Sequence, residues 1–448
     1  MQPSGTDIGK VTFQDIIRNF SPTWFAATMG TGAISILFSA FPYGHATAPM
    51  RALSLTFFFL NLLLFMLFTA LSITRYARYP QSWTTMLYHP SLSLYTGCFP
   101  MGATTLINVS VDVINVEYAF GGANLFGQYG GRTSRYRYCA VGAWCTLCTL
   151  VDFFRRTKRT YSFASRSTTH RHTLHAMTAA WLLPVVTLTV AASSGGVLAR
   201  ALQPHSHSYA LTTVVVSTFL VIIGLTLALM LITIYFLRLI LHGLPPREKI
   251  LSVFLPLGPS AQSAFAILLI GQNFRTLLPL PDGTSASLVL LAKNTGETIH
   301  VVCVAAAFLL WALAVMCIVF ALLGIYSTVR VRRQRFPFIL PFWGLVFPNG
   351  VFANLTLNLA AAFDSPFFRI LGSVYAVATL LVWTFVASRT LSMVYDRTIF
   401  AAPPDDINDQ ASLEVNQKLD ALGHESLEQS ASPSSSSSAT ASICVARP

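Results

Sequence analysis

Residues 302–323 read VCVAAAFLLWALAVMCIVFALL, a run of 22 residues without a charged side chain. About 20 apolar residues are enough for one helix to cross the hydrocarbon core of a bilayer. Residues 55–73, LTFFFLNLLLFMLFTALSI, have the same character. The chain as a whole agrees, because 54% of its 448 residues are hydrophobic and only 10% are charged, against about 25% in soluble domains. The sequence therefore predicts an all-α integral membrane protein.

Apolar runs of this kind recur along the chain and predict ten transmembrane helices. The fourth of these runs is short and flanked by arginines, whereas the other nine have the length and hydropathy of membrane helices. The segment before the first span lacks the apolar core of a signal peptide, so we expect the first helix to direct targeting. The expected spans are 21–41, 53–73, 93–113, 137–154, 176–199, 210–238, 251–272, 300–327, 337–360 and 367–393.

The distribution of Lys and Arg predicts the orientation of the spans. With the N-terminus inside the cell, 20 of the 29 basic residues fall in cytoplasmic segments and 8 fall outside, as the positive-inside rule requires. This topology accounts for the net charge of +12, and nucleic acid is not an expected partner. We expect a plasma-membrane protein with a cytoplasmic segment at 1–20, a transport domain at 21–399 and a disordered cytoplasmic tail at 400–448, which is acidic and then serine-rich.

Each odd-numbered span carries a proline in or at the start of its apolar run, and the even-numbered spans carry none. The spacings are 78, 84, 75 and 89 residues, about one helical hairpin each. Proline removes a backbone donor, and a bilayer tolerates the freed carbonyl groups only where protein or a water-filled cavity satisfies them. The pattern predicts five helical hairpins around a central pore, with these prolines on the pore side: Pro22, Pro100, Pro184, Pro259 and Pro348.

The odd-numbered spans contain almost no ionisable side chain between their ends. Ionisable residues inside a membrane usually mark cation sites or proton relays, so a proton-coupled cation carrier is not expected. A pore of small polar groups, aromatic rings and helix dipoles favours a weakly held anion. A dicarboxylate has two charges to neutralise, and the absence of Arg and Lys well inside the odd spans favours a small, singly charged substrate.

Five segments around the prolines are characteristic in content and order: NFSPTWFAATMGTG (19–32), HPSLSLYTGCFPMGATTLINV (89–109), MTAAWLLPVVTLTVAASSGG (177–196), LGPSAQSAFAILLIG (257–271) and FWGLVFPNGVF (342–352). In these segments the chain resembles the tellurite-resistance/dicarboxylate transporter family, which includes the slow anion channels of plant guard cells. Within that family it is most similar to the fungal sulfite efflux pumps. The resemblance implies ten helices in a quasi-fivefold arrangement, inner helices kinked at the prolines, and often a homotrimer.

The same resemblance implies a gate. In that family a phenylalanine beside the proline of the ninth helix closes the pore, and the matching residue here is Phe347. Phe25 and Phe99 also stand beside prolines and are further candidates to face the pore. With the five prolines, the residues expected to line the pore or kink its helices are Phe25, Gly30, Phe99, Gly102, Ser260, Asn349 and Gly350.

Residues 127–172 depart from the family pattern. Eight of the 24 arginines fall in these 46 residues, where the family has a tryptophan-rich apolar helix. The segment resembles out-of-frame or intronic translation that regains register near MTAAWLLP (177–184). Its Cys145 and Cys148 form a lone C-x-x-C without a second pair, so no metal or cofactor is predicted.

Three transport functions stay open at this point: export of sulfite or bisulfite, a permease for malate or another C4-dicarboxylate, and a gated chloride or nitrate channel. An enzyme is not expected, because the sequence has no H-x-x-x-H pair, no G-x-S-x-G motif and no intramembrane carboxylate dyad. The expected partners are a small anion and the lipid bilayer.

Overall fold

The computed structural model describes residues 12–44, 47–88, 92–111, 177–204, 206–245, 247–280, 287–331 and 338–400. Every regular element in these ranges is a helix, in agreement with an all-α membrane protein. Eight of them, some joined to a short 3₁₀ segment, are long and apolar enough to cross a membrane. The chain divides into two units, 1–399 and 400–448. The second unit after Phe400, the fourth predicted span and the segment 127–172 lie outside the described residues.

Two kinds of long helix alternate along the described chain. The inner helices begin with a short 3₁₀ helix: η1 (Pro22–Trp24) before α2 (Phe25–Ala40), η2 (Leu92–Gly97) before α5 (Cys98–Val109), η5 (Ala179–Leu182) before α8 (Leu183–Leu202), η6 (Arg247–Phe254) before α10 (Leu257–Leu277), and η8 (Leu340–Leu345) before α13 (Val346–Phe363). The outer helices are longer: α3 (Ala48–Arg78), α9 (His207–His242), α12 (Thr295–Tyr326) and α14 (Pro366–Tyr395). Short helices α1 (Phe13–Asn19), α4 (Pro80–Tyr88) and α11 (Leu288–Leu291) complete the α-helical set.

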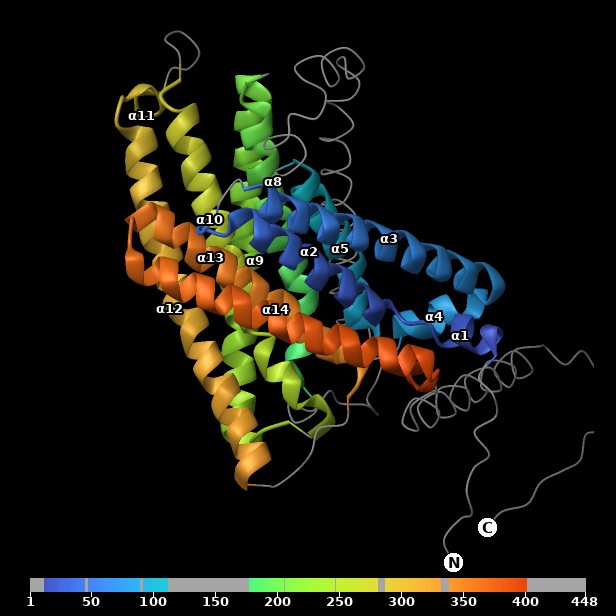
Figure 1. Ribbon diagram of the computed structural model, residues 1–448. Coiled ribbons are helices and arrows are strands. Elements are labelled where there is room, and N and C mark those ends of the chain that lie inside the picture. Colours follow the sequence, from blue (N-terminus) through green and yellow to red (C-terminus); the bar gives the residue numbers. More distant parts are fainter. Residues whose placement is uncertain are drawn as a thin grey trace, which may run out of the picture. The chain divides into compact units, whose positions relative to one another are not determined.

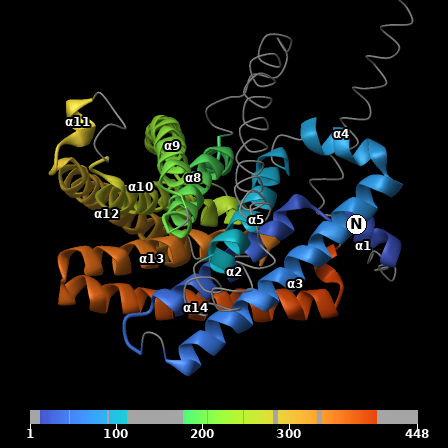
Figure 2. The same cartoon turned by 90° about the horizontal axis from the view of Figure 1, so that it is seen from above.

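The five inner helices contact one another in a closed cycle. Helix α2 touches α5, α5 touches α8, α8 touches α10, α10 touches α13, and α13 returns to α2. Each outer helix packs on the inner helix that precedes it in the chain: α3 on α2, α9 on α8, α12 on α10 and α14 on α13. Figures 1 and 2 show the last of these pairs, α13 and α14 in orange, running side by side. The described residues therefore form four hairpins plus the inner helix α5.

Burial separates the two kinds of helix. Four of the inner helices, taken with their 3₁₀ starts, are long enough to cross a membrane. In the apolar part of each of these, 78% to 89% of the residues are buried, against 17% to 33% in the outer helices. Large apolar side chains of the outer helices, such as Phe219, Leu309 and Leu381, are mostly exposed. An exposed apolar surface of this extent suits contact with lipid. The inner helices form the protein core and the outer helices cover it.

The five prolines lie where the inner helices begin. Pro184 is the second residue of α8, Pro100, Pro259 and Pro348 are the third residues of α5, α10 and α13, and Pro22 starts η1. The first turn of an α-helix has unpaired N–H groups in any case, so a proline there removes no helical hydrogen bond. The prolines thus lie where 3₁₀ geometry gives way to α-helix, and the described α-helical parts have no proline further along.

Hydrogen bonds from aromatic side chains connect outer helices to inner ones. Trp383 Nε1 on α14 donates to Thr31 Oγ1 on α2 (3.1 Å). Trp311 Nε1 on α12 donates to Thr356 Oγ1 on α13 (3.0 Å). Since buried polar groups need partners in an apolar surrounding, these pairs fix how the outer helices are rotated against the core.

The helix that precedes the first span is capped by its own side chains. Thr12 donates from its backbone N–H (2.9 Å) and from its hydroxyl (2.6 Å) to the Asp15 carboxylate. The hydrogen bond from the Thr12 side chain, followed by that from its backbone, holds the pKa of the Asp15 carboxyl below its ordinary value. This capping box defines where α1 begins.

Candidate functional site

A small cavity lies where the five inner helices meet. It receives side chains from every member of the cycle, α2, α5, α8, α10 and α13. Its volume of about 30 Å³ leaves room for only one or two water molecules. The lining residues are Ala33, Ile36, Thr105, Asn108, Val190, Ser193, Gln262, Phe265, Phe347, Gly350, Val351 and Asn354.

The polar part of the lining consists of neutral groups. None of the described residues that line the cavity has an ionisable side chain. Hydroxyl and amide groups can replace part of an ion's hydration shell without the tight binding that an opposite charge would give. The polar lining residues are Thr105, Asn108, Ser193, Gln262 and Asn354.

A short hydrogen-bond chain fixes one side of the cavity. Gln262 Nε2 on α10 donates to Ser193 Oγ on α8 (2.6 Å), and Ser193 Oγ donates to the Val190 carbonyl (2.8 Å). Gln262 and Ser193 are both buried. The chain connects two neighbouring helices of the cycle and holds the Gln262 amide in a defined orientation.

Helix α13 contributes most of the other side. Phe347, the residue before Pro348, lines the cavity and is 6% exposed. One turn further on, Gly350 lies against α2: a Cβ there would come within 2.8 Å of the Ala33 Cβ. Phe347 and Gly350 are thus the two sequence-predicted site residues that the structure brings to this cavity. The closing role of Phe347 stays a prediction.

Other predicted residues face neighbouring helices. The rings of Phe25 and Phe99 meet edge to face at 5.0 Å, and both pack against Phe65 of the outer helix α3. Asn349 donates to the Leu345 carbonyl (2.7 Å) and accepts a hydrogen bond from Tyr375 of α14 (2.6 Å). These three residues therefore connect inner helices to outer ones and do not line the cavity.

The remaining predicted residues serve contacts within the cycle or at helix starts. A Cβ on Gly102 would lie 2.4 Å from Thr28 Oγ1, and one on Gly30 would lie 3.0 Å from Val346 Cβ, so both glycines allow close approach of neighbouring inner helices. Ser260 is buried and donates to the Pro256 carbonyl (3.1 Å). The five prolines stand at the helix starts and are not among the cavity-lining residues.

Sequence reasoning missed the polar residues of the cavity. Asn108, Ser193, Gln262 and Asn354 each follow the proline of their own helix by three to nine residues. A polar side chain soon after the proline of an otherwise apolar span was a usable signal, because polar groups inside a membrane usually have a function. The sequence alone did not show which side of the helix each one faces.

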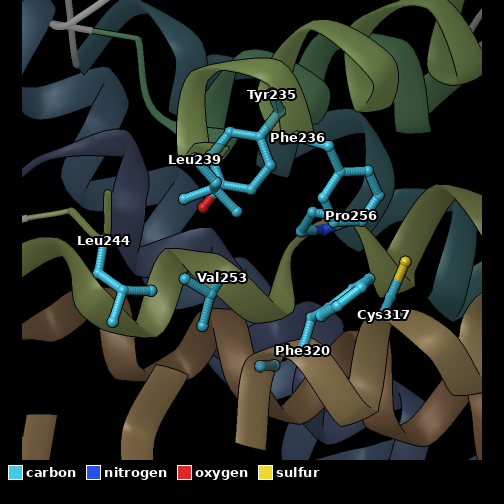
Figure 3. A pocket seen from close by; sticks show the side chains of 9 residues that line it. Tyr235, Phe236, Leu239, Leu244, Val253, Pro256, Cys317 and Phe320 are labelled. Carbon is cyan, nitrogen blue, oxygen red and sulfur yellow. The ribbon is translucent and has the colours of Figure 1, made fainter. Parts of the chain in front are cut away.

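A second cavity lies outside the inner cycle, between α9, η6 and α12. Figure 3 shows Tyr235 and Phe236 of α9 on one side of this cavity. Val253 of η6 and Cys317 and Phe320 of α12 lie across from them. Its volume is about 20 Å³ and its walls are mainly apolar, so it offers no path across the protein. Elsewhere in the described ranges, no group of three His, Cys, Asp or Glu side chains is placed to hold a metal ion.

Known proteins are similar to this chain in sequence over most of its length. A profile described as voltage-dependent anion channel matches residues 19–391, a range that includes the central cavity and every described span except the last four residues of α14. The chain is 33% identical over 391 residues to a sulfite efflux pump of Trichophyton rubrum, covering 86% of this chain and 93% of the relative. It is 23% identical to the malic acid transport protein of Schizosaccharomyces pombe (82% and 76% covered) and 23% identical to a sulfite efflux pump of Saccharomyces cerevisiae (80% and 84% covered).

Proposed function

This chain belongs to the voltage-dependent anion channel family, and from that premise we propose that it exports sulfite or bisulfite across the plasma membrane. The anion passes between the five inner helices. The observation that carries the proposal is the central cavity, which all five inner helices line. Helices α5, α8, α10 and α13 contribute hydroxyl and amide groups, α2 contributes apolar groups, and none of the described lining residues is ionisable.

The charge of the lining favours sulfite species over malate. Moving an ion out of water is costly unless the protein supplies compensating charge or hydrogen bonds. A C4-dicarboxylate has two separated charges, and the lining offers neutral partners only. Relatives named as sulfite efflux pumps and as a malic acid transport protein both exist, so malate is the competing substrate that an experiment has to include.

The proposed architecture is ten spans in five hairpins, arranged with quasi-fivefold symmetry around the pore. The closed cycle of α2, α5, α8, α10 and α13 supports it, as do the four outer helices that each pack on the preceding inner helix. The fifth outer helix would come from the chain between α5 and η5. From the resemblance of the sequence we further propose a homotrimer.

We assign the gate to Phe347. Its ring lines a cavity that holds one or two waters at most. An aromatic ring in so narrow a passage leaves water without hydrogen-bond partners, and an anion that must shed its water meets a barrier of several kcal/mol. Pro22, Pro100 and the other prolines shape the inner helices at one end, and Gly350, one turn after Phe347, lets α13 approach Ala33 of α2 closely.

Orientation follows from the basic residues. Both termini are proposed to be cytoplasmic, since 20 of 29 Lys and Arg residues then lie inside. A single cysteine placed in the tail after residue 400 of a variant without other reactive cysteines should resist membrane-impermeant thiol reagents on intact cells. Labelling from outside would reverse the assignment.

The decisive experiment is flux in proteoliposomes. The full chain is reconstituted, and efflux of labelled sulfite, malate, chloride and nitrate is measured against protein-free liposomes. Sulfite efflux above that of malate is the expected result. Malate flux that exceeds sulfite flux would replace the proposed substrate with a dicarboxylate, and no flux of any anion would end the proposal.

A further inference from the structure

Two amide side chains of the cavity have N–H groups left for a ligand. Gln262 Nε2 uses one hydrogen in its bond to Ser193 Oγ (2.6 Å). Asn354 has its Oδ1 occupied, because Asn358 Nδ2 donates to it (3.2 Å). An amide nitrogen has two hydrogens, so Gln262 keeps one and Asn354 keeps two. These donors come from α10 and α13, on adjacent sides of the cavity, and suit the oxygen atoms of an anion.

The same cavity also has hydrogen-bond acceptors, on α5. Asn108 is 6% exposed, and its Oδ1 has no hydrogen-bond partner among the described residues. The Thr105 hydroxyl donates its hydrogen to the Gly102 carbonyl (2.8 Å), so towards a ligand its oxygen can only accept a hydrogen bond. A buried oxygen without a donor is unfavourable. Because Asn108 lines the cavity, a ligand there that brings its own hydrogen would give this oxygen a partner.

We propose that the cavity selects a protonated, singly charged oxyanion, so that bisulfite and not the sulfite dianion is the transported species. Its O–H donates to Asn108 Oδ1, while its remaining oxygens accept from Gln262 Nε2 and Asn354 Nδ2. Chloride and fully ionised oxyanions only accept hydrogen bonds, and the Asn108 oxygen disfavours them. This inference rests on the proposed function and specifies its substrate.

The charge of the surroundings supports the same choice. The cost of moving an ion from water into a low dielectric grows with the square of its charge, so a dianion costs about four times as much as a monoanion. The ionisable side chains within the five inner α-helices are Cys98 on α5, Arg200 on α8 and Arg275 on α10. None of the three lines the cavity. The two arginines bond Gln272 and Glu297. No basic residue of the described lining offsets a second negative charge.

The pH dependence of flux tests the inference directly. Since no described lining residue titrates, a change of sulfite flux relative to chloride flux reports the protonation of the substrate. The full chain in proteoliposomes receives a constant total sulfite concentration, at equal pH on both sides. Protein-free liposomes correct for diffusion of neutral sulfur dioxide. We expect the ratio of sulfite to chloride flux to fall about tenfold per pH unit above the pKa of bisulfite. A ratio that is flat or rises with pH overturns the inference.

Variants of Asn108 test the acceptor itself. Asn108→Leu keeps the size and removes the acceptor, and should lower the ratio of bisulfite to chloride flux about tenfold, as expected for one lost hydrogen bond to an ion. Asn108→Thr retains a hydroxyl oxygen and should keep most of the ratio. Asn273→Leu is the matched control, because Asn273 of α10 is buried but bonds the Gly196 carbonyl (2.9 Å) away from the cavity. It should leave the ratio unchanged whatever its effect on expression.

The outcomes distinguish failure of the bisulfite selection from failure of the proposed sulfite export. An Asn108→Leu protein that loses chloride and bisulfite flux equally, or neither, overturns the acceptor role. Sulfite flux that does not depend on bisulfite concentration overturns the selection of the protonated anion and leaves sulfite export standing. Absence of sulfite flux in the wild-type protein overturns the export function itself. The wild-type pH series stays informative even if Asn108→Leu does not fold.

Discussion

Helices α10 and α12 form one hairpin and differ in almost every respect. The inner helix α10 is the less apolar of the two and is mostly buried, whereas the outer helix α12 is the more apolar and mostly exposed. This is the reverse of a soluble protein, where the most apolar segments lie inside. The bilayer is the reason, because lipid accepts apolar side chains as well as a protein core does. Polar and small residues within a span therefore mark the protein interior.

The largest expected contrast concerns two phenylalanines of one inner helix. Phe347 lines the cavity, while Phe352 packs against Tyr375 at 4.8 Å and stacks on Trp311 at 6.0 Å, both from outer helices. Phe347→Ala should raise anion flux about tenfold or more, since removing the ring lowers a barrier of several kcal/mol. Flux per molecule at equal reconstitution is the measurement.

Phe352→Ala is the matched control on the same helix. It should lower the free energy of unfolding by about 3–5 kcal/mol, because it empties a packed site, without raising flux. Thermal unfolding in detergent, followed beside the flux assay, separates the two effects. If Phe347→Ala unfolds more easily and conducts no better, the ring is a packing element and the gate assignment is wrong.

A leucine pair tests whether the inner helices carry the stability. Leu268 on α10 is 1% exposed and Leu309 on α12 is 69% exposed. Leu268→Ala should cost about 2–5 kcal/mol of unfolding free energy, and Leu309→Ala should stay within about 0.5 kcal/mol. Denaturant titration of both variants in the same micelles gives the difference. Equal losses would mean that α12 is covered by protein in the native assembly, as a homotrimer interface would require.

Eight of the ten expected spans correspond to described helices that are long and apolar enough to cross a membrane, because the bilayer sets the length and hydropathy of such helices. The span expected at 337–360 corresponds to η8 and α13, which together run from Leu340 to Phe363. Phe347 and Gly350 line the cavity, and their roles in a pore stay predictions. Residues 127–172 and the tail lie outside the described residues, so those expectations stay predictions.

The direction in which each polar residue faces could not be predicted. Asn349 and Asn354 lie five residues apart on α13, about 140° around the helix. Asn349 is the residue predicted to face the pore, but its side chain accepts a hydrogen bond from Tyr375 of α14, and Asn354 lines the cavity. Asn61 and Asn108 are each a single asparagine in an apolar run, yet only Asn108 reaches the cavity. The rotation of an inner helix against its neighbours depends on packing with several other helices, and no sequence period records it.

Glycines give a smaller contrast between the two kinds of helix. A Cβ on Gly350 of α13 would lie 2.8 Å from Ala33 Cβ, whereas one on Gly324 of α12 would meet only the flexible end of Leu244 at 3.2 Å. Gly350→Ala should therefore separate α13 from α2 and cost about 1–3 kcal/mol. Gly324→Ala should be neutral or stabilise by up to about 1 kcal/mol through helix propensity. Thermal unfolding of the pair is the test, and a tolerated Gly350→Ala would show that the inner cycle can expand.

The smallest expected effect concerns the tryptophan–threonine hydrogen bonds between outer and inner helices. Trp383→Phe removes the donor to Thr31 Oγ1 and keeps most of the aromatic contact with Phe57, whose ring lies 4.9 Å away. Thr31 still donates to the Ala27 carbonyl (2.7 Å), so no buried hydrogen is left unpaired. The loss should be about 0.5–1.5 kcal/mol, the net value of one hydrogen bond.

Trp311→Phe is the parallel variant, because Thr356 likewise keeps its bond to the Phe352 carbonyl (2.7 Å). The two losses should be similar and should add in the double variant, since the bonds join different helix pairs and share no partner. Unfolding free energies of the two single variants and the double variant provide the measurement. A coupling well above 0.5 kcal/mol in the double variant would mean that the outer helices move as one layer and not as separate partners of the inner helices.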